Sequence, residues 1–579
     1  MIVQRVEKRW PQRLAAVATV AAFFAYVFFC TNPHYDLGDD VLLARSFGGM
    51  VGGEYESFNY ITHTFLGWLM HGLSLLWPGV AWFSVAQVAL LWISAYAAVL
   101  SAMRAAQRLA LPSWCGWLTG TAYLMGLVAE GLTSITYTLT AAVAGGAAVW
   151  LLLAVDWQSG RKAVIRGTMG SGALLYAAYL LRTQAFLPSL CIWVGALLTL
   201  GLMKKVGWRT LGTGAVAVAV LFGISAGVRA VQLSAPEHAS YLAWQAARTQ
   251  AIDYGGLAAA DAQALEGAGW TPEMAELALS GCLLDESVTT ETLAAFEPPA
   301  EAHSLQEMME TLRVLFRRSR GTYWACVALA GLCALAGLLA LAGPRGLRLW
   351  PLLAAIGTGI AAAAMLLYLA WMGRLPARAA MTVLLPAIAL VLWLTLSGAA
   401  GLWGSGRVWR QTAAVAVVLM CAAMLAPCAK TAYHNTYNPY PSQGESVCTR
   451  LERYALAHGD RLFIADLSLG DDRSLFPDWS AGKPDNLLLA WGGWNNHSEG
   501  YCAAFANFGY EHDGFRIADF VNSPLRLVTG AGTQPSDAFM ACLSQQSGQD
   551  ITVVLEAKED GFQVFRFTTE TVDKGDGNP

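Results

Sequence analysis

Two adjacent carboxylates, Asp39 and Asp40, stand nine residues beyond the first apolar segment of the chain. A charged pair so close to an apolar segment is costly unless it is solvated, caps a helix or takes part in chemistry. A carboxylate can remove the proton of an attacking hydroxyl group. We therefore predict that the pair takes part in chemistry, as a general base or as a ligand of a divalent metal ion. The alternative is that one of them caps a helix beginning at Val41.

A second group of candidates is cationic. Arg182, Arg374 and Arg378 stand at the ends of apolar segments, on the same predicted face as the acidic pair. Membrane proteins disfavour arginine on this face, so each of the three needs a reason to be there. Because guanidinium groups bind phosphate oxygens well, we predict that they converge on a lipid phosphate. The alternative is that each side chain extends to anionic headgroups in general.

Five further residues could contact a substrate. Glu130 ends the third apolar segment, His63 lies in an apolar stretch of the first outer loop, and Arg248 lies in a long polar insert. Trp491 and Trp494 belong to the segment WGGWNNHSEGY, where exposed indoles could stack on a sugar ring. The structural alternatives are an exposed loop carboxylate for Glu130, a hydrogen-bonded structural histidine for His63, and a packed strand end and turn for the two tryptophans.

The elements that must position these residues are membrane helices. Of the 579 residues, 55% are hydrophobic and 13% are charged, whereas a soluble domain has about 25% charged residues. A span needs about 20 apolar residues. Eleven segments fit, so we predict a polytopic α-helical membrane protein. They are 14–30, 80–103, 111–128, 137–155, 163–181, 186–202, 211–231, 323–341, 349–372, 379–396 and 412–429.

Basic residues set the orientation. They precede the first span and fill every second connection, as Arg5, Lys8, Arg9, Arg13, Arg104, Arg108, Arg161, Lys162, Arg166, Lys204, Lys205, Arg209, Arg345, Arg348, Arg407 and Arg410. The positive-inside rule places them, with the N-terminus, in the cytoplasm. Residues 60–77 are apolar, but a crossing there would put Arg104 outside, so we predict an interfacial helix. The first span lacks a small-residue cleavage site and is read as a retained signal anchor.

The domain organisation follows from these spans. Residues 1–429 form the membrane domain, with an outer loop at 31–79 and an outer helical insert at 232–320. Residues 430–579 form an extracytoplasmic α/β domain with strands near 461–469, 486–493 and 525–532, a helix at 536–546 and a hairpin at 551–569. Its last residues, 573–579, are expected to be disordered. Cys448, Cys502 and Cys542 could form a disulfide, but their spacing does not give the pairing.

The basic N-terminus, one span, an outer loop reading GDDVLLARSFGG, an interfacial helix and a second span together resemble the GT-C superfamily. Its members are integral-membrane glycosyltransferases that use polyprenyl-phosphate sugars. The resemblance implies that Asp39 matches the aspartate of the first outer loop and Asp40 the acidic position after it. It thereby implies that Asp39 is the general base and that Asp40 orients it or binds a divalent metal ion. Glu130 stands where a second outer loop sometimes has another acid. It also implies a polyprenyl-phosphate sugar donor, an envelope glycan or lipid acceptor, no nucleic-acid partner and a bacterial plasma membrane.

Three function classes remain open at this point. A glycosyltransferase acting on the outer face is favoured. A transporter or flippase of a lipid-linked sugar would bring charges into span centres and would have symmetric halves, and these span centres are nearly free of charge. A non-catalytic envelope assembly protein of the same fold differs from the enzyme only in activity.

Overall fold

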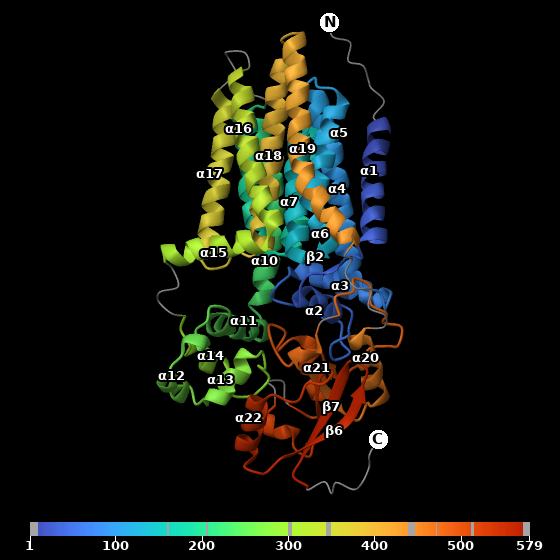
Figure 1. Ribbon diagram of the computed structural model, residues 1–579, viewed down its shortest axis with the longest axis vertical. Coiled ribbons are helices and arrows are strands. Elements are labelled where there is room, and N and C mark those ends of the chain that lie inside the picture. The colour runs from blue at the N-terminus through green and yellow to red at the C-terminus, as the bar shows by residue number, and fades with distance from the viewer. Residues whose placement is uncertain are drawn as a thin grey trace.

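The structure is a computed structural model that describes residues 10–158, 161–203, 206–298, 304–342, 349–437, 446–470, 472–510 and 515–570. A long helical bundle forms one end of the molecule, and smaller helices and a sheet form the other end (Figure 1). The first turn of α1 (Trp10–Cys30) lies at the end of the bundle that is far from the sheet. These smaller helices and the sheet are together called the outer part, because they lie beyond one end of the bundle, and the candidate site lies where they meet the bundle.

Eight helices in the described ranges are long and apolar enough to cross a membrane. Besides α1 they are α4 (Trp82–Arg108), α9 (Thr183–Leu202), α10 (Trp208–Leu233), α16 (Arg320–Ala342), α17 (Leu349–Trp371), α18 (Ala377–Trp403) and α19 (Arg407–Tyr437). The other three predicted spans are also helical but are interrupted, short or basic at one end. They are α5 (Ser113–Tyr123) with η1 (Leu124–Val128) and α6 (Ala129–Thr133), α7 (Tyr137–Leu153), and α8 (Arg161–Leu181). The chain is thus polytopic, and the count of eleven crossings stays a prediction.

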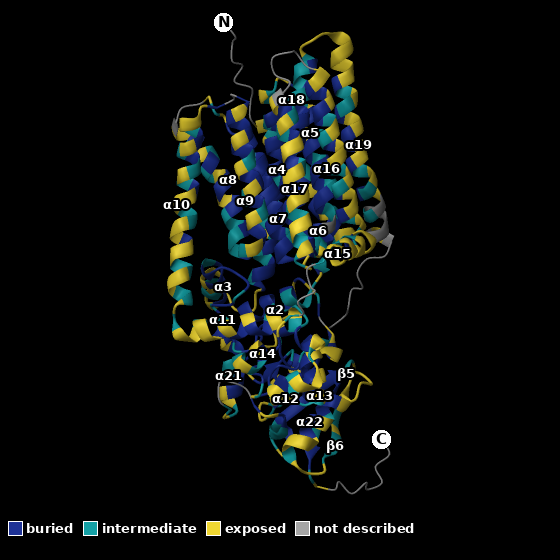
Figure 2. Ribbon diagram, turned by 90° about the vertical axis from the view of Figure 1, so that its left-hand side faces the viewer, coloured by how far each residue is buried: buried dark blue, intermediate teal, exposed yellow. Residues whose placement is uncertain are grey.

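Helices α7 and α18 form the centre of the bundle, and α10 and α17 lie at its surface (Figure 2). Small residues allow the close packing of α7. A Cβ atom on Gly145 would lie 2.2 Å from the Ser189 hydroxyl of α9, and one on Gly146 would lie 2.1 Å from the Tyr123 hydroxyl of α5. Close helix contact through small residues is typical of membrane bundles.

The segment between α1 and α4 carries α2 (Gly38–Phe47) and α3 (Thr64–Leu76). Helix α3 lies across the outer end of the bundle (Figure 1). It exposes Trp68, Leu69 and Leu75, an apolar edge that suits the membrane interface. The loop is also pinned to the start of α7, because β1 (His34–Tyr35) pairs in parallel with β2 (Ser134–Ile135).

The insert consists of short helices. They are α11 (Pro236–Arg248), η2 (Thr249–Asp253), η3 (Leu257–Ala259), α12 (Ala262–Gly267), α13 (Pro272–Leu279), α14 (Thr290–Ala294) and α15 (Leu305–Arg318). Helix α13 begins after Thr271, whose hydroxyl accepts a hydrogen bond from the Met274 N–H at 3.2 Å. This N-cap is of the type that stabilises helix starts.

The C-terminal part has a five-stranded sheet in the order β4-β3-β5-β7-β6. Its strands are β3 (Leu462–Ala465), β4 (Leu487–Leu488), β5 (Leu525–Gly530), β6 (Thr552–Glu559) and β7 (Phe562–Thr568), and its helices are α20 (Val447–Ala457), η4 (Leu467–Leu469), α21 (Glu499–Asn507), η5 (Ile517–Phe520) and α22 (Asp537–Ser547). Strand β3 runs parallel to β4 and β5, whereas β7 is antiparallel to β5 and β6.

The eleven cysteines, all within the described ranges, form no disulfide. Residues 573–579 lie outside the described ranges.

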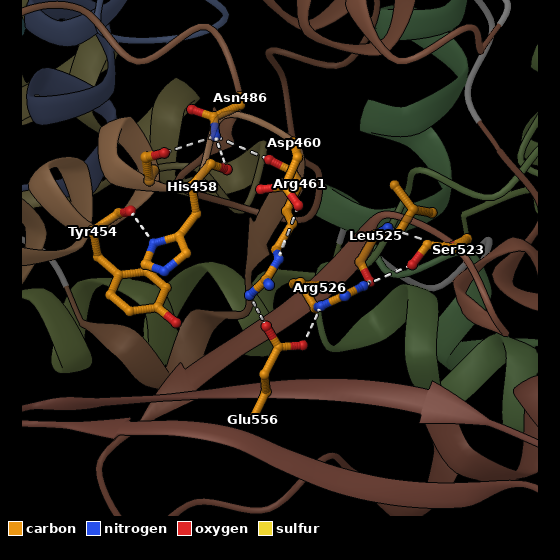
Figure 3. A network of polar contacts seen from close by, with 10 residues as sticks. Tyr454, His458, Asp460, Arg461, Asn486, Ser523, Leu525, Arg526 and Glu556 are labelled. Carbon is orange, nitrogen blue, oxygen red and sulfur yellow. Dashed lines mark hydrogen bonds and ion pairs between the residues drawn. The ribbon is translucent and has the colours of Figure 1, made fainter. Parts of the chain in front are cut away.

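A polar network stiffens this sheet (Figure 3). Glu556 of β6 accepts hydrogen bonds from Arg461 and, at 2.5 Å, from Arg526 of β5. The Asn486 amide donates to the carbonyl oxygens of Ala455, His458 and Arg461 at 2.9–3.1 Å. These contacts fasten the segment before β4 to the core, and the chain after β4 leads directly to Trp494.

Candidate active site

The acidic pair lies in the first turn of α2, where the helix dipole favours negative charge. Helix α2 begins at Gly38, and its N-cap residue Leu37 makes no side-chain cap. The alternative of a cap on a helix starting at Val41 is therefore wrong. Asp40 instead caps a different helix, because its Oδ1 accepts a hydrogen bond at 2.7 Å from the N–H of Tyr137, the first residue of α7.

Asp40 is fully buried, and its Oδ2 has no hydrogen-bond partner among the described residues. Burial raises the pKa of the Asp40 carboxyl well above its usual range, and the nearby Asp39 charge acts in the same direction. The Tyr137 N–H and Arg378 act against this shift. A carboxyl so placed can orient its neighbours, but an acceptor molecule cannot reach it.

Asp39 is half-buried and more accessible than Asp40. The indole N–H of Trp494 donates a hydrogen bond to its Oδ1 at 3.1 Å. No described residue donates a hydrogen bond to its Oδ2. One oxygen is therefore held while the other is available, which is an arrangement suited to proton abstraction.

Two of the three predicted arginines meet the acidic pair at Tyr137. The Arg182 guanidinium donates a hydrogen bond to the Tyr137 hydroxyl and lies 4.9 Å from the ring centroid. Arg378, in the first turn of α18, interacts electrostatically with both Tyr137 and Asp40. Tyr137 therefore has two cations and two carboxyl groups around it.

Arg374 does not join this group directly. It pairs with Asp253 at 3.1 Å and lies over the Tyr254 ring at 4.1 Å. The buried Arg248 pairs with the same carboxylate at 3.1 Å. Asp253 therefore holds Arg374 in a neighbouring cluster, and the convergence of all three arginines on a lipid phosphate stays a prediction.

Tyr60 connects the two clusters. It interacts electrostatically with Arg248, Asp253, Asp39 and Arg182. Its ring centroid lies 6.1 Å from that of Trp494. Segments that lie more than 400 residues apart in the chain are thus neighbours in one site.

The remaining candidates have mainly structural roles. His63 is the N-cap of α3, where its Nδ1 accepts the Phe65 N–H at 3.2 Å and its Nε2 lies 3.1 Å from the Ser225 hydroxyl. Burial, followed by the charge of Arg229, lowers the pKa of His63 to about 4, so the ring is neutral. Glu130 lies in α6, and its side chain is outside the described part of the chain.

The two tryptophans differ from the expectation of exposed indoles. Trp491 and Trp494 are only 4% and 7% exposed, so that expectation is wrong. Trp491 stacks on Phe539 at 6.0 Å and belongs to the core between the insert and the sheet. Trp494 lies at the site, but it offers Asp39 an N–H group rather than offering a ligand an open ring face.

Sequence reasoning missed several residues of the site. Tyr137 and Tyr60 carry no motif. Gln87 does carry a signal, because it is a polar residue within the apolar helix α4. Its Oε1 accepts a hydrogen bond from the Thr140 hydroxyl at 3.1 Å, and its side chain is one of the groups that lower the pKa of the Asp40 carboxyl. For the metal ion predicted at Asp40, no group of three or more His, Cys, Asp or Glu side chains among the described residues is placed to bind it.

Helix α2 is fixed to the C-terminal part by a buried ion-pair cluster. Arg45 pairs with Glu452 of α20 and, at 3.5 Å, with Asp472. All three side chains are 5% exposed or less. Backbone contacts support the same junction, since the Tyr35 N–H donates to the Arg473 carbonyl at 2.8 Å. The aspartates of α2 are therefore positioned by the outer part as well as by the bundle.

A second contact of the loop with the C-terminal part contains a buried carboxyl. Gly52, with φ of +62°, packs so closely on α21 that a Cβ atom would lie 1.9 Å from the Gly500 carbonyl oxygen. Beside it, the fully buried Glu56 accepts a hydrogen bond from the Ser498 hydroxyl at 2.6 Å. Burial raises the pKa of Glu56 to about 7, and the Ser498 hydrogen bond only partly offsets it.

This shift predicts a pH-dependent effect of Glu56→Gln. The unfolded chain loses the Glu56 proton near pH 4.5, whereas the folded chain keeps it until about pH 7, so wild-type stability falls across that window as pH rises. Glutamine does not ionise, so the variant does not lose this stability. Its free energy of unfolding relative to wild type is expected to be about 2–3 kcal/mol higher at pH 8 than at pH 5. Thermal unfolding of both proteins at these two pH values measures the difference. The exposed Glu54→Gln is the control, and an equal effect of Glu56→Gln at both pH values would contradict the prediction.

An apolar groove of about 630 Å³ lies between α8, α9 and α10. Tyr179 and Phe186 line one end of it, on either side of Arg182 in the sequence. Leu211 and Trp208 line it further along α10. The groove thus runs within the apolar part of the bundle and has Arg182 close to its outer end.

No protein-family model and no curated protein matches the chain. Among solved structures, the chain is similar to ArnT from Cupriavidus metallidurans bound to undecaprenyl phosphate, at 11% identity over 95% of this chain and 97% of that chain, with a TM-score of 0.46. The apo state of the same ArnT gives 12% identity over the same shares, with a TM-score of 0.39. At TM-scores this low, no residue is assigned by correspondence, and the roles proposed below rest on the geometry of this chain.

Proposed function

We propose that this chain is a membrane glycosyltransferase that moves a sugar from a polyprenyl-phosphate donor to a cell-envelope glycan or lipid on the outer face of a bacterial plasma membrane. The observation that carries the proposal is the set of charges that act on Tyr137, namely Asp39, Asp40, Arg182 and Arg378. An apolar groove accompanies it, lined by Tyr179 and Phe186 on either side of Arg182 in the sequence. A lipid phosphate has an apolar tail and an anionic head. The groove offers a place for the first and the arginines a place for the second.

The chemistry assigns a role to each group. Asp39 Oδ2 takes the proton of the acceptor hydroxyl while the oxygen of that hydroxyl attacks the anomeric carbon of the donor sugar. The bond from that carbon to the phosphate oxygen breaks, and the charge of the departing polyprenyl phosphate is stabilised by Arg182 and Arg378. Asp40 holds α7, and with it Tyr137, against α2. The acceptor enters from the side of the outer domain, where Tyr60 and Trp494 lie.

Donor binding tests the phosphate side of this proposal. Arg182→Met is expected to weaken binding of polyprenyl phosphate roughly tenfold to a hundredfold, because it removes charge-assisted hydrogen bonds to the phosphate. Titration of the purified protein with polyprenyl phosphate, followed by native mass spectrometry, measures the change. Arg374→Met, on the same face but held by Asp253, is expected to cause a smaller loss. Equal losses in the two variants would argue against a phosphate site at Arg182.

Filling the groove tests the tail side. Ala219→Phe places a ring in the groove and is expected to lower polyprenyl-phosphate affinity, while affinity for a short-chain prenyl phosphate changes less. Ile360→Phe, on the exposed surface of α17, is the matched control. If both variants bind the long-chain lipid as wild type does, the groove is not the donor site.

A further inference from the structure

The loop that carries Trp494 is held by the insert and not by the sheet alone. The Trp494 carbonyl oxygen accepts hydrogen bonds from the Tyr241 hydroxyl, at 2.7 Å, and from the Gln245 amide, both on α11. Burial raises the pKa of Tyr241 well above its usual range, so the hydroxyl stays protonated and remains a donor. Two donors on one carbonyl fix the backbone of Trp494 against α11.

Further contacts fasten the same loop on both sides of Trp494. The Leu283 N–H of the insert donates to the Trp491 carbonyl at 3.1 Å, and the Asn496 amide donates to the Leu283 carbonyl. The ring of His497 lies edge-on to Trp244 of α11 at 4.9 Å. The position of the Trp494 indole is therefore set by the insert, and its N–H reaches Asp39 on α2.

The direction of this last hydrogen bond is fixed by chemistry. An indole N–H can only donate, and an ionised carboxylate can only accept. The contact therefore places Asp39 Oδ1 at the indole N–H as its acceptor. It also orients the carboxylate, because Oδ1 is held and Oδ2 is left for the acceptor.

We propose that Trp494 is a positioning residue for the general base Asp39. Helix α11 sets this contact by holding the Trp494 backbone. The outer insert and the C-terminal domain together then govern the activity of Asp39. This inference rests on the proposed function, since it assigns Asp39 the role of base. It makes the outer parts components of the active site. They are then required for the rate of the reaction and not only for recognition of the acceptor.

The change that isolates the contact is Trp494→Phe, which keeps an aromatic ring and removes the N–H. Loss of the donor leaves the carboxylate free to turn away from the acceptor, so kcat is expected to fall about tenfold while the KM for the lipid-linked donor stays as in wild type. Tyr241→Phe keeps Trp494 and removes one of the two donors to its backbone, so a smaller fall in kcat is expected. Trp491→Phe is the matched control, because its indole N–H has no partner among the described residues.

The experiment measures initial rates of sugar transfer over a range of donor concentrations in proteoliposomes of the full chain, which gives kcat and KM separately. The donor is the lipid-linked sugar pool extracted from a deletion strain, and the acceptor is the envelope fraction of the same cells. Wild type, Asp39→Asn, Trp494→Phe, Tyr241→Phe and Trp491→Phe are compared at equal amounts of folded protein.

The outcomes separate the two proposals. A lower kcat with an unchanged KM in Trp494→Phe, with Trp491→Phe as wild type and Asp39→Asn inactive, supports both. A wild-type kcat in Trp494→Phe, with Asp39→Asn inactive, overturns the positioning role and leaves the proposed function intact. Activity of Asp39→Asn at the wild-type rate overturns both. If Trp494→Phe fails to fold, Tyr241→Phe decides by the same fall in kcat.

Discussion

Asp39→Asn lowers the rate of sugar transfer by about 10²–10⁴-fold, the contribution usually made by a positioned general base. Asparagine keeps the size and the hydrogen-bond acceptor that Trp494 contacts, but it cannot take a proton. The affinity for polyprenyl phosphate is expected to change little, because Arg182 and Arg378 are retained. Initial rates and donor titrations on the same preparation measure the two effects separately.

Asp40→Asn is the companion variant, and its expected behaviour is different. Asp40 is buried and holds the first N–H of α7, a contact that an amide oxygen can also make. We therefore expect partial activity, with the loss arising from displaced α7 and Tyr137. If Asp40→Asn were inactive and Asp39→Asn active, the two roles would have to be exchanged.

Arg45→Met destabilises the junction between α2 and the C-terminal part by about 3–5 kcal/mol, because it leaves two carboxylates buried without a cation. Arg45 is 2% exposed, and Glu452 and Asp472 have no other arginine or lysine within ion-pair distance among the described residues. Chemical or thermal unfolding of the detergent-solubilised protein measures the loss. Limited proteolysis is expected to cut the outer part first.

Arg313→Met is the matched control for Arg45. Arg313 pairs with Glu310 at 2.7 Å, but both side chains are more than half exposed. Exposed pairs of this kind contribute about 0–1 kcal/mol. A loss for Arg45→Met as small as that for Arg313→Met would mean that the buried cluster does not hold α2 in place.

Much of the architecture could be predicted from periodicity and charge. All eleven apolar segments are helical, because a segment of this length in a bilayer must satisfy its backbone groups internally. The helix start at Thr271-Pro272 and the hairpin of β6 and β7 follow from local capping and turn chemistry. The position of Asp39 near the bundle could be predicted because it lies in the loop that directly follows the first apolar segment.

The composition of the site could not be predicted, because it depends on contacts between distant segments. Trp494 reaches Asp39 across 455 positions, and Arg45 reaches Glu452 across 407. No local pattern encodes such pairs. Arg374 looked equivalent to Arg378 four residues later, and only the fold of the insert, which presents Asp253, separates them.

The central claim is that the acidic pair of α2 carries sugar transfer to the envelope. The most direct measurement compares envelope glycans and lipids of cells that make wild-type protein, the Asp39→Asn, Asp40→Asn double variant or no protein, with equal membrane insertion of both proteins confirmed. The account predicts that the double variant lacks the same envelope sugar as the deletion. A double variant with the wild-type envelope, in the presence of a deletion phenotype, would contradict it and would favour transport or assembly as the function.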